Sequence, residues 1–130
     1  MASSSEYKSR MNYYSKKIAS CKEEISNYEK LIKKLTKLKG NLPTIKENLK
    51  QAETNFLNGG YNDNGETLDR GVLKQNYDKL EIVVSDLTRL IANVNSKISD
   101  LNSSISSYQD SYAYNRRKYY NALQEESNNV

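Results

Sequence analysis

The side chains that most often carry out enzyme chemistry are scarce in this sequence. It has no histidine and a single cysteine, Cys21, so the commonest general base, a cysteine–histidine pair and the usual transition-metal ligand sets are missing. The carboxylates are scattered without the spacing of a calcium loop, and no glycine-rich phosphate loop is present. We therefore expect a protein that is not an enzyme and that needs no metal or other cofactor.

Cys21 itself has the features of a structural residue. It falls on an apolar stripe, where a thiol behaves as a small hydrophobic side chain, and no histidine is available to activate it. A lone cysteine also cannot form a disulfide within the chain. The fold must therefore be held by packing alone.

Binding chemistry is better represented than catalysis, because tyrosine and arginine gather near both ends of the chain. Eight of the eleven tyrosines lie in residues 7–14 and 108–120. Tyrosine beside arginine is typical of protein interfaces, since a rigid ring gives contact area at little entropic cost. We single out four candidate partner-binding residues here, which we expect to be exposed at an open end of the molecule: Tyr114, Arg116, Arg117 and Tyr120.

These residues can meet only if the chain folds back on itself, and the apolar pattern predicts that it does. In the second half, apolar residues recur in alternating steps of three and four from Leu73 to Tyr112, and more weakly to Ala122. The first half shows the same steps from Tyr14 to Leu35, and then a stammer-like slip to Leu38 before the stripe continues through Leu42, Ile45, Leu49, Ala52 and Phe56. This period is typical of helices that pair through a narrow seam.

Four of the five glycines lie between these two stripes, in residues 58–71. Glycine favours chain reversal because it adopts positive φ without strain. We therefore predict one all-α domain, 1–130, that forms a long antiparallel, coiled-coil-like helical hairpin. Its first arm covers about 6–57, its turn 58–70 and its second arm about 71–125. A kink or break is expected near Gly40 and Pro43, with Asn41 capping the restarted helix.

Charge and hydropathy bound the choice of partner. The chain carries a net charge of +4, and its first arm is the more basic, with twelve Lys and Arg against six Asp and Glu in residues 1–57. Acidic residues are interspersed, which favours a solvated helix face over nucleic acid or anionic membrane as the explanation. No signal-peptide core or membrane span is evident, so we expect a cytoplasmic protein.

Apolar residues beside the main stripes indicate a second binding face. A two-helix hairpin gives each helix one neighbour, and the extra apolar residues widen the stripe beyond what one neighbour covers. We expect a helical protein partner, with a homodimer as an alternative. These extra residues are Leu31, Leu57, Leu68, Val72, Ile82, Val83 and Leu90.

The turn resembles one known family. The segment from Phe56 through Gly59, Gly60 and Tyr61, followed by an Asn-Gly pair and by Asp69-Arg70-Gly71, is similar to the turn of longer members of the WXG superfamily, which are encoded beside LXG polymorphic toxins. The likeness in architecture covers most of the chain, and the specific residues lie between Phe56 and Leu73. Phe56 would take the place of the family tryptophan.

The resemblance implies a non-enzymatic adaptor or targeting chaperone of Gram-positive type VII secretion. Such a protein binds the helical domain of an LXG-type toxin, with a second small helical protein as a further partner, through turn residues Phe56, Gly59, Gly60, Tyr61, Asp69 and Gly71. The family's C-terminal aromatic-x-x-x-acid signal is not matched, because Gln124 stands at the acidic position after Tyr120. Export with the partner and retention in the cytoplasm both stay open. The alternatives of another class are a self-associating structural coiled coil and a basic helical protein bound to nucleic acid or membrane.

Overall fold

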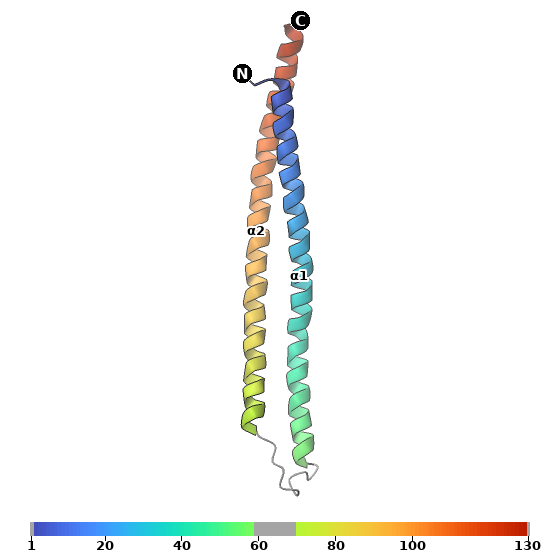
Figure 1. Cartoon of the computed structure of the whole chain (residues 1–130), viewed down its shortest axis with the longest axis vertical. Helices are drawn as coiled ribbons and strands as arrows, with labels where there is room; N and C mark the ends of the chain where they lie inside the picture. The colour runs from blue at the N-terminus through green and yellow to red at the C-terminus, as the bar shows by residue number, and fades with distance from the viewer. Residues whose placement is uncertain (1, 59–69, 130) are drawn as a thin grey trace. The chain divides into compact units, whose positions relative to one another are not determined.

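The computed structural model describes residues 2–58 and 70–129, and these residues are all-α. Two helices, α1 (Ser4–Asn58) and α2 (Arg70–Asn128), pack against each other as a helical hairpin (Figure 1). The predicted arms are confirmed to within three residues at each end. No segment within the described residues is long and apolar enough to cross a membrane.

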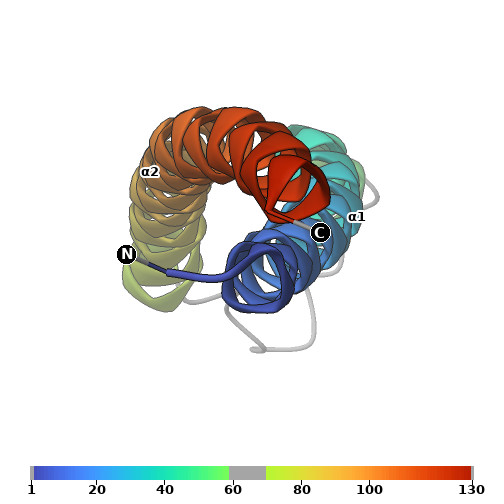
Figure 2. The same ribbon diagram turned by 90° about the horizontal axis from the view of Figure 1, so that it is seen from above.

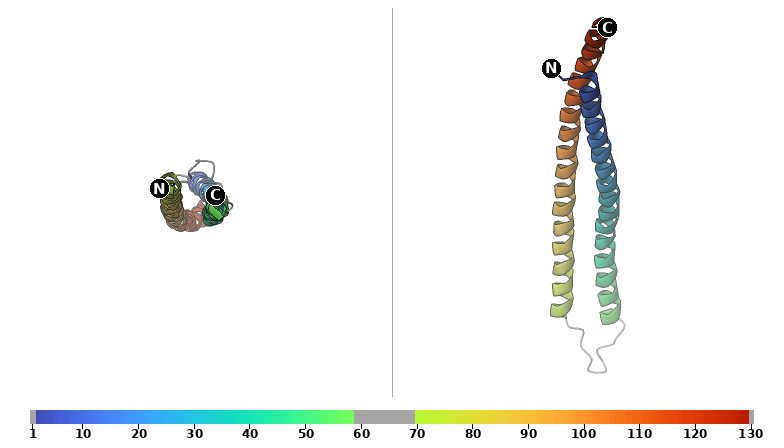
Figure 3. Two further views of the ribbon diagram at one scale, coloured as in Figure 1. Left: turned by 90° about the horizontal axis from the view of Figure 1, so that it is seen from below. Right: turned by 45° about the horizontal axis from the view of Figure 1, so that its top comes forward.

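The residues group into two packing units. Unit 1 comprises residues 1–30 and 95–130, and unit 2 comprises residues 31–94. In unit 1 the N-terminal part of α1 lies beside the C-terminal part of α2, as the blue and red ribbons show from above (Figure 2). In unit 2 the second half of α1 accompanies the first part of α2 (Figure 3).

The helices run antiparallel in each unit, because the contact partners on α2 have lower residue numbers as the residue numbers on α1 rise. In unit 1 the ring of Tyr14 lies 6.0 Å from that of Tyr108, centroid to centroid. In unit 2 the Tyr77 hydroxyl donates a hydrogen bond to the Glu53 carboxylate at 2.9 Å. The core is accordingly thin, and its buried apolar side chains are Leu42, Tyr77, Val94, Ile105 and Ala122.

The stripe predicted for α2 is confirmed. Every described stripe residue from Tyr77 to Tyr112 is buried or half-buried, and the weak extension to Tyr119 and Ala122 also faces inward. A further inward position, Asn115, continues the same steps and is only 6% exposed. Sequence reading passed over it because asparagine carries no apolar signal.

The stripe predicted for α1 is confirmed up to Leu35 and again at buried Leu42, and it is wrong at Leu38, Ile45 and Ala52. The structure shows no slip: the regular steps continue through Lys39, Leu42, Lys46, Leu49 and Glu53, all of which face inward except Leu49, which is 37% exposed. Leu38, Ile45 and Ala52 lie off these steps and are exposed. A helix packed along one seam keeps its period, because absorbing two successive three-residue steps requires local overwinding. The backbone geometry therefore turned the apolar residues outward and left two lysines and a glutamate in the seam.

The predicted break near Gly40 and Pro43 is also wrong. Helix α1 runs unbroken from Ser4 to Asn58, with Pro43 inside it. Proline removes one backbone hydrogen bond and disfavours helix by about 3 kcal/mol. Residues on both sides of it, including buried Leu42, pack against α2, so the helix continues through the proline.

Gly40 offers a direct test of this continuous helix. A Cβ added at Gly40 would meet no atom within 4 Å, and alanine is favoured over glycine in a helix interior by roughly 1 kcal/mol. We expect Gly40→Ala to raise the free energy of unfolding by about 0.5–1 kcal/mol in urea titrations. The matched control is Ala19→Gly, an exposed position one residue after an inward one, as Gly40 is. Ala19→Gly should lower the free energy of unfolding by a similar amount. If Gly40→Ala instead lowered it, Gly40 would not lie in a continuous helix.

The two ends of the described chain are joined by a cap. Ser4 opens α1, and its backbone amide and Oγ donate to the two carboxylate oxygens of Glu126 at 3.0 and 2.7 Å. The Ser3 Oγ accepts from the Glu6 amide at 3.2 Å. Free amides at a helix start favour such acceptors and negative charge. The backbone bond from Ser4, followed by its side-chain bond, lowers the pKa of Glu126 below the ordinary 4.5.

This lowered pKa predicts a pH dependence. A carboxylate whose folded pKa is depressed contributes stability above its unfolded pKa and loses it as the pH falls through the folded value. Glu126→Gln should therefore lower the melting temperature at pH 7, and the gap to the wild type should narrow once the pH falls below the ordinary pKa of 4.5 and close as it passes the lower folded pKa. Glu125→Gln, the neighbouring exposed position, should leave the gap near zero at every pH. A gap of constant size would exclude the charged cap.

Candidate functional site

The turn residues singled out from the sequence fall in the part of the chain that is not described. Gly59, Gly60, Tyr61 and Asp69 lie outside the described residues. Phe56 lies in the last turns of α1 and Gly71 at the start of α2, and their side chains are also outside the description. The predicted role of this turn in partner binding therefore stays a prediction.

The aromatic and basic residues of unit 1 do come together. The Tyr14 and Tyr108 rings meet across the two helices, and Tyr13 packs edge-on against Tyr14 with centroids 5.2 Å apart. Cations cover several rings on the same helix: Lys17 lies 5.4 Å from the Tyr13 centroid and Arg10 lies 5.3 Å from that of Tyr7. Each such contact contributes about 0.5–1 kcal/mol at an exposed site.

The four predicted open-end residues do not form one surface. Arg116, Arg117 and Tyr120 line a shallow hollow together with Tyr112 and Ala113, and the Arg116 guanidinium lies 5.8 Å from the Tyr120 centroid. Tyr114 faces elsewhere, with the Lys118 ammonium 5.6 Å from its ring. Both tyrosines are about half exposed, as expected for residues off the stripe.

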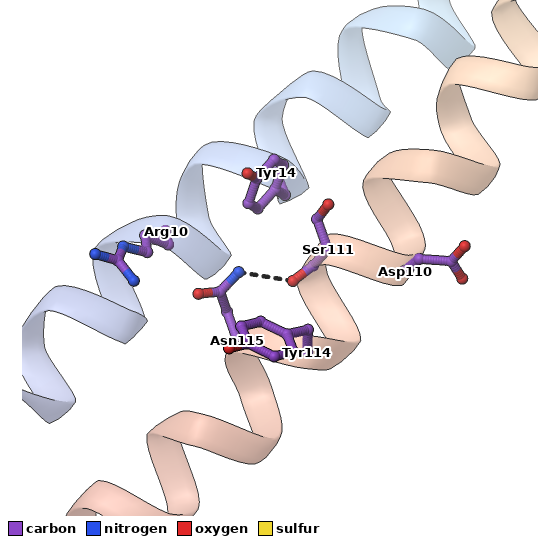
Figure 4. A pocket seen from close by; sticks show the side chains of 6 residues that line it. All are labelled: Arg10, Tyr14, Asp110, Ser111, Tyr114 and Asn115. Atoms are coloured by element: carbon purple, nitrogen blue, oxygen red, sulfur yellow. Dashed lines mark hydrogen bonds between the residues drawn. The ribbon is translucent and has the colours of Figure 1, made fainter. Parts of the chain in front are cut away.

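Tyr114 instead lines a groove of unit 1 with a volume of about 450 Å³ (Figure 4). Helix α1 contributes Arg10 and Tyr14 to it, and α2 contributes Asp110, Ser111 and Asn115 as well as Tyr114. The Asn115 side-chain amide donates to the Ser111 carbonyl at 2.7 Å, within the same helix. This bond satisfies the buried amide without linking the two helices. The groove is open and is lined by charged, polar and aromatic side chains together.

Unit 2 holds a small hollow on one side of its seam. It is lined by Leu42, Pro43, Lys46, Leu80, Glu81 and Val84. Lys46 and Glu81 form an ion pair across it, and the hydrogen bond and charge of Lys46 lower the pKa of Glu81. Further along, burial and then Glu53 raise the pKa of Tyr77. These polar contacts link α1 to α2 in unit 2. Lys46 and Glu53 stand at inward positions of α1, which are ordinarily apolar in a two-helix seam.

The opposite side of the same seam carries the apolar residues that the register turned outward. We call Leu31, Leu38, Ile45, Val83 and Leu90 the outer apolar face; they are 39%, 48%, 45%, 42% and 44% exposed. Each stands immediately before an inward residue, in the g position of the heptad, where a and d form the seam. In an antiparallel pair the g positions of both helices flank the same side of the seam.

The register places these residues side by side. Because Lys46 meets Glu81 and Glu53 meets Tyr77, Leu38 lies level with Leu90, and Ile45 lies level with Val83. We call these two pairs the rungs of the outer apolar face. Sequence reading had noted Leu31, Val83 and Leu90 as extra apolar residues, but it assigned Leu38 and Ile45 to the core and so missed the rungs.

In unit 1 the g positions of the heptad are occupied by polar residues. The residues before its inward positions are Arg10, Lys17 and Glu24 on α1 and Lys97, Ser104, Ser111 and Lys118 on α2. A stripe restricted to a and d suits a two-helix seam, whereas apolar residues at a, d and g are typical of a helix with more than one neighbour. Unit 1 thus resembles a complete pair of helices, and unit 2 resembles part of a larger bundle.

Among residues 2–58 and 70–129, no three His, Cys, Asp or Glu side chains lie close enough together to hold a metal ion. Cys21 is a free, half-buried residue of the α1 stripe. Comparison with protein-family models, curated proteins and solved structures finds no match to this chain.

Proposed function

We propose that this protein is a non-enzymatic adaptor that binds a helical partner through the outer apolar face of unit 2. The observation that carries this proposal is the exposure of the two rungs, Leu38 with Leu90 and Ile45 with Val83, beside a seam that already contains Lys46 and Glu53. Burying an exposed aliphatic side chain contributes about 1.5–3 kcal/mol if it becomes fully covered. A partner helix lying along this face would supply that cover.

The partner we propose is the helical domain of an LXG-type toxin of type VII secretion. The support for this step is the likeness of Phe56-Leu57-Asn58-Gly59-Gly60-Tyr61 and Asp69-Arg70-Gly71 to the turn of WXG-superfamily proteins, together with the helical-hairpin fold. In this role the adaptor shields the toxin's apolar helices and accompanies it to the secretion machine. The family's C-terminal export signal has an acidic residue four positions after an aromatic one, and Gln124 stands at that position after Tyr120. Export with the toxin and retention after loading it therefore both fit this role.

Co-expression tests this proposal directly. The adaptor is produced with the helical N-terminal domain of an LXG-type toxin encoded beside it, the toxin domain is captured by a tag, and the mass of the complex is measured in solution. We expect a stable stoichiometric complex. A discrete homo-oligomer that leaves the toxin domain unbound would overturn the secretion role and favour a self-associating coiled coil.

A parallel measurement asks which surface the partner uses. The double variant Tyr114→Ala/Tyr120→Ala removes the two tyrosines of the predicted open-end set, both of which are exposed in unit 1. If the outer apolar face is the main binding surface, this variant should bind the toxin domain within about threefold of the wild type. A loss as large as that caused by changes in the two rungs would move the principal binding surface to the open end.

A further inference from the structure

The charges around the outer apolar face are unevenly distributed between its two rungs. Within four residues of Leu38 and Leu90 stand four cations and one acid; these are Lys34, Lys37, Lys39, Arg89 and Asp86. All are exposed except Lys39, which is half-buried. The surroundings of this rung are therefore strongly basic.

The other rung is balanced. Within four residues of Ile45 and Val83 stand two cations and three acids; these are Lys46, Lys79, Glu47, Glu81 and Asp86. Lys46 and Glu81 are already paired with each other, the one ion pair found in the described part of the chain. Free positive charge thus accumulates at the Leu38–Leu90 end of the face and not at the other.

We infer that the occupant of this face is an amphipathic helix whose polar flanks are acidic where it meets the Leu38–Leu90 rung. This inference rests on the proposed function and adds the partner's chemistry and orientation to it. Complementary charge steers association and fixes register more than it adds affinity. A second copy of this chain fits less well. A twofold axis parallel to the helices would bring the two basic rungs together, and one perpendicular to them would set each basic rung against the Ile45–Val83 rung of the other copy, whose charges nearly cancel.

A pair of synthetic helices provides the probe. Both peptides carry the same leucines at heptad spacing, and they differ only in their flanking residues, which are glutamate in one and lysine in the other. Binding to the full-length protein is followed by fluorescence anisotropy at 50 and 500 mM salt. We expect the glutamate peptide to bind about tenfold more tightly at low salt and the preference to shrink at high salt, where surface charges are screened.

Charge reversal on the protein identifies the source of the preference. Lys34→Glu/Lys37→Glu should abolish or invert it, while Lys16→Glu/Lys17→Glu, an equal change of charge on exposed residues of unit 1, should leave it in place. Equal binding of both peptides, or a preference that survives the first variant and not the second, would overturn the inference while leaving a helix-binding face intact.

The remaining outcomes separate this inference from the proposed function. If neither peptide binds but the toxin domain does, the acidic-helix inference is wrong and the adaptor role stands. If neither peptide nor toxin domain binds and the protein self-associates, both are wrong, and the face is an interface between copies.

Discussion

The double variant Leu38→Asp/Leu90→Asp is expected to weaken partner binding by at least 100-fold while keeping its helical content. The two leucines form one rung of the outer apolar face, and both are more than two-fifths exposed in the free protein. In a complex each aspartate would be stripped of water without finding a hydrogen-bonding partner, and the apolar packing of each leucine would be missing as well. Two such penalties of about 1.4 kcal/mol each already amount to a factor of 100.

This result would be informative because the same change elsewhere should be harmless. Leu123 in unit 1 is 38% exposed, so Leu123→Asp makes the same substitution once, at a similar exposure but away from the face; it is compared with each single variant, Leu38→Asp and Leu90→Asp, as well as with the double. Binding would be measured by titration against the toxin domain, and folding by circular dichroism and melting temperature. Equal loss of binding in Leu123→Asp, or unfolding of the double variant, would remove the support for a docking face on unit 2.

Ile105→Ala should produce the largest loss of stability from a conservative change. Ile105 is 8% exposed and is one of five buried apolar side chains among the described residues. Truncating a buried isoleucine to alanine costs about 2–5 kcal/mol, because transfer energy is lost and a cavity opens. A domain of this size has on the order of 5–15 kcal/mol in total, so this single change should remove a large share of it.

Ile82→Ala is the matched control, since Ile82 is 59% exposed on the same helix. It should change the free energy of unfolding by less than about 0.5 kcal/mol. Both variants would be compared by urea denaturation with the slope checked for constancy. If Ile105→Ala and Ile82→Ala lowered stability equally, the side of α2 that contains Ile105 would not be buried against α1.

The seam of α2 shows how far the sequence could be read. Its apolar residues from Tyr77 to Tyr112 keep one period without interruption, so only one helix face can be buried, and the structure buries it. Asn115 was missed because a polar residue at an inward position leaves no apolar signal. Its burial was implied by the weak extension of the stripe from Tyr112 to Ala122, because those three-four steps pass through position 115.

Helix α1 shows where such reading fails. Beyond Leu35 two neighbouring stripes compete: an apolar one through Leu38 and Ile45, and a polar one through Lys39 and Lys46. Apolar character favours the first, and the regular helical period favours the second. The choice depends on which side of α1 meets α2, and local sequence does not contain that information.

The sequence by itself therefore determined two long helices and their antiparallel pairing. It also led to the expectation that the protein is not an enzyme. These follow from the period of apolar residues and from composition, which act locally. The tertiary structure decided that α1 continues through Pro43, that Tyr114 parts from Arg116, Arg117 and Tyr120, and that Leu38 and Ile45 face outward. The continuation through Pro43 depends on the packing of residues on both sides of it against α2. The outward position of Leu38 and Ile45 depends on the rotation of α1 against α2, because a helix with two adjacent candidate stripes can bury only one of them against a single neighbour.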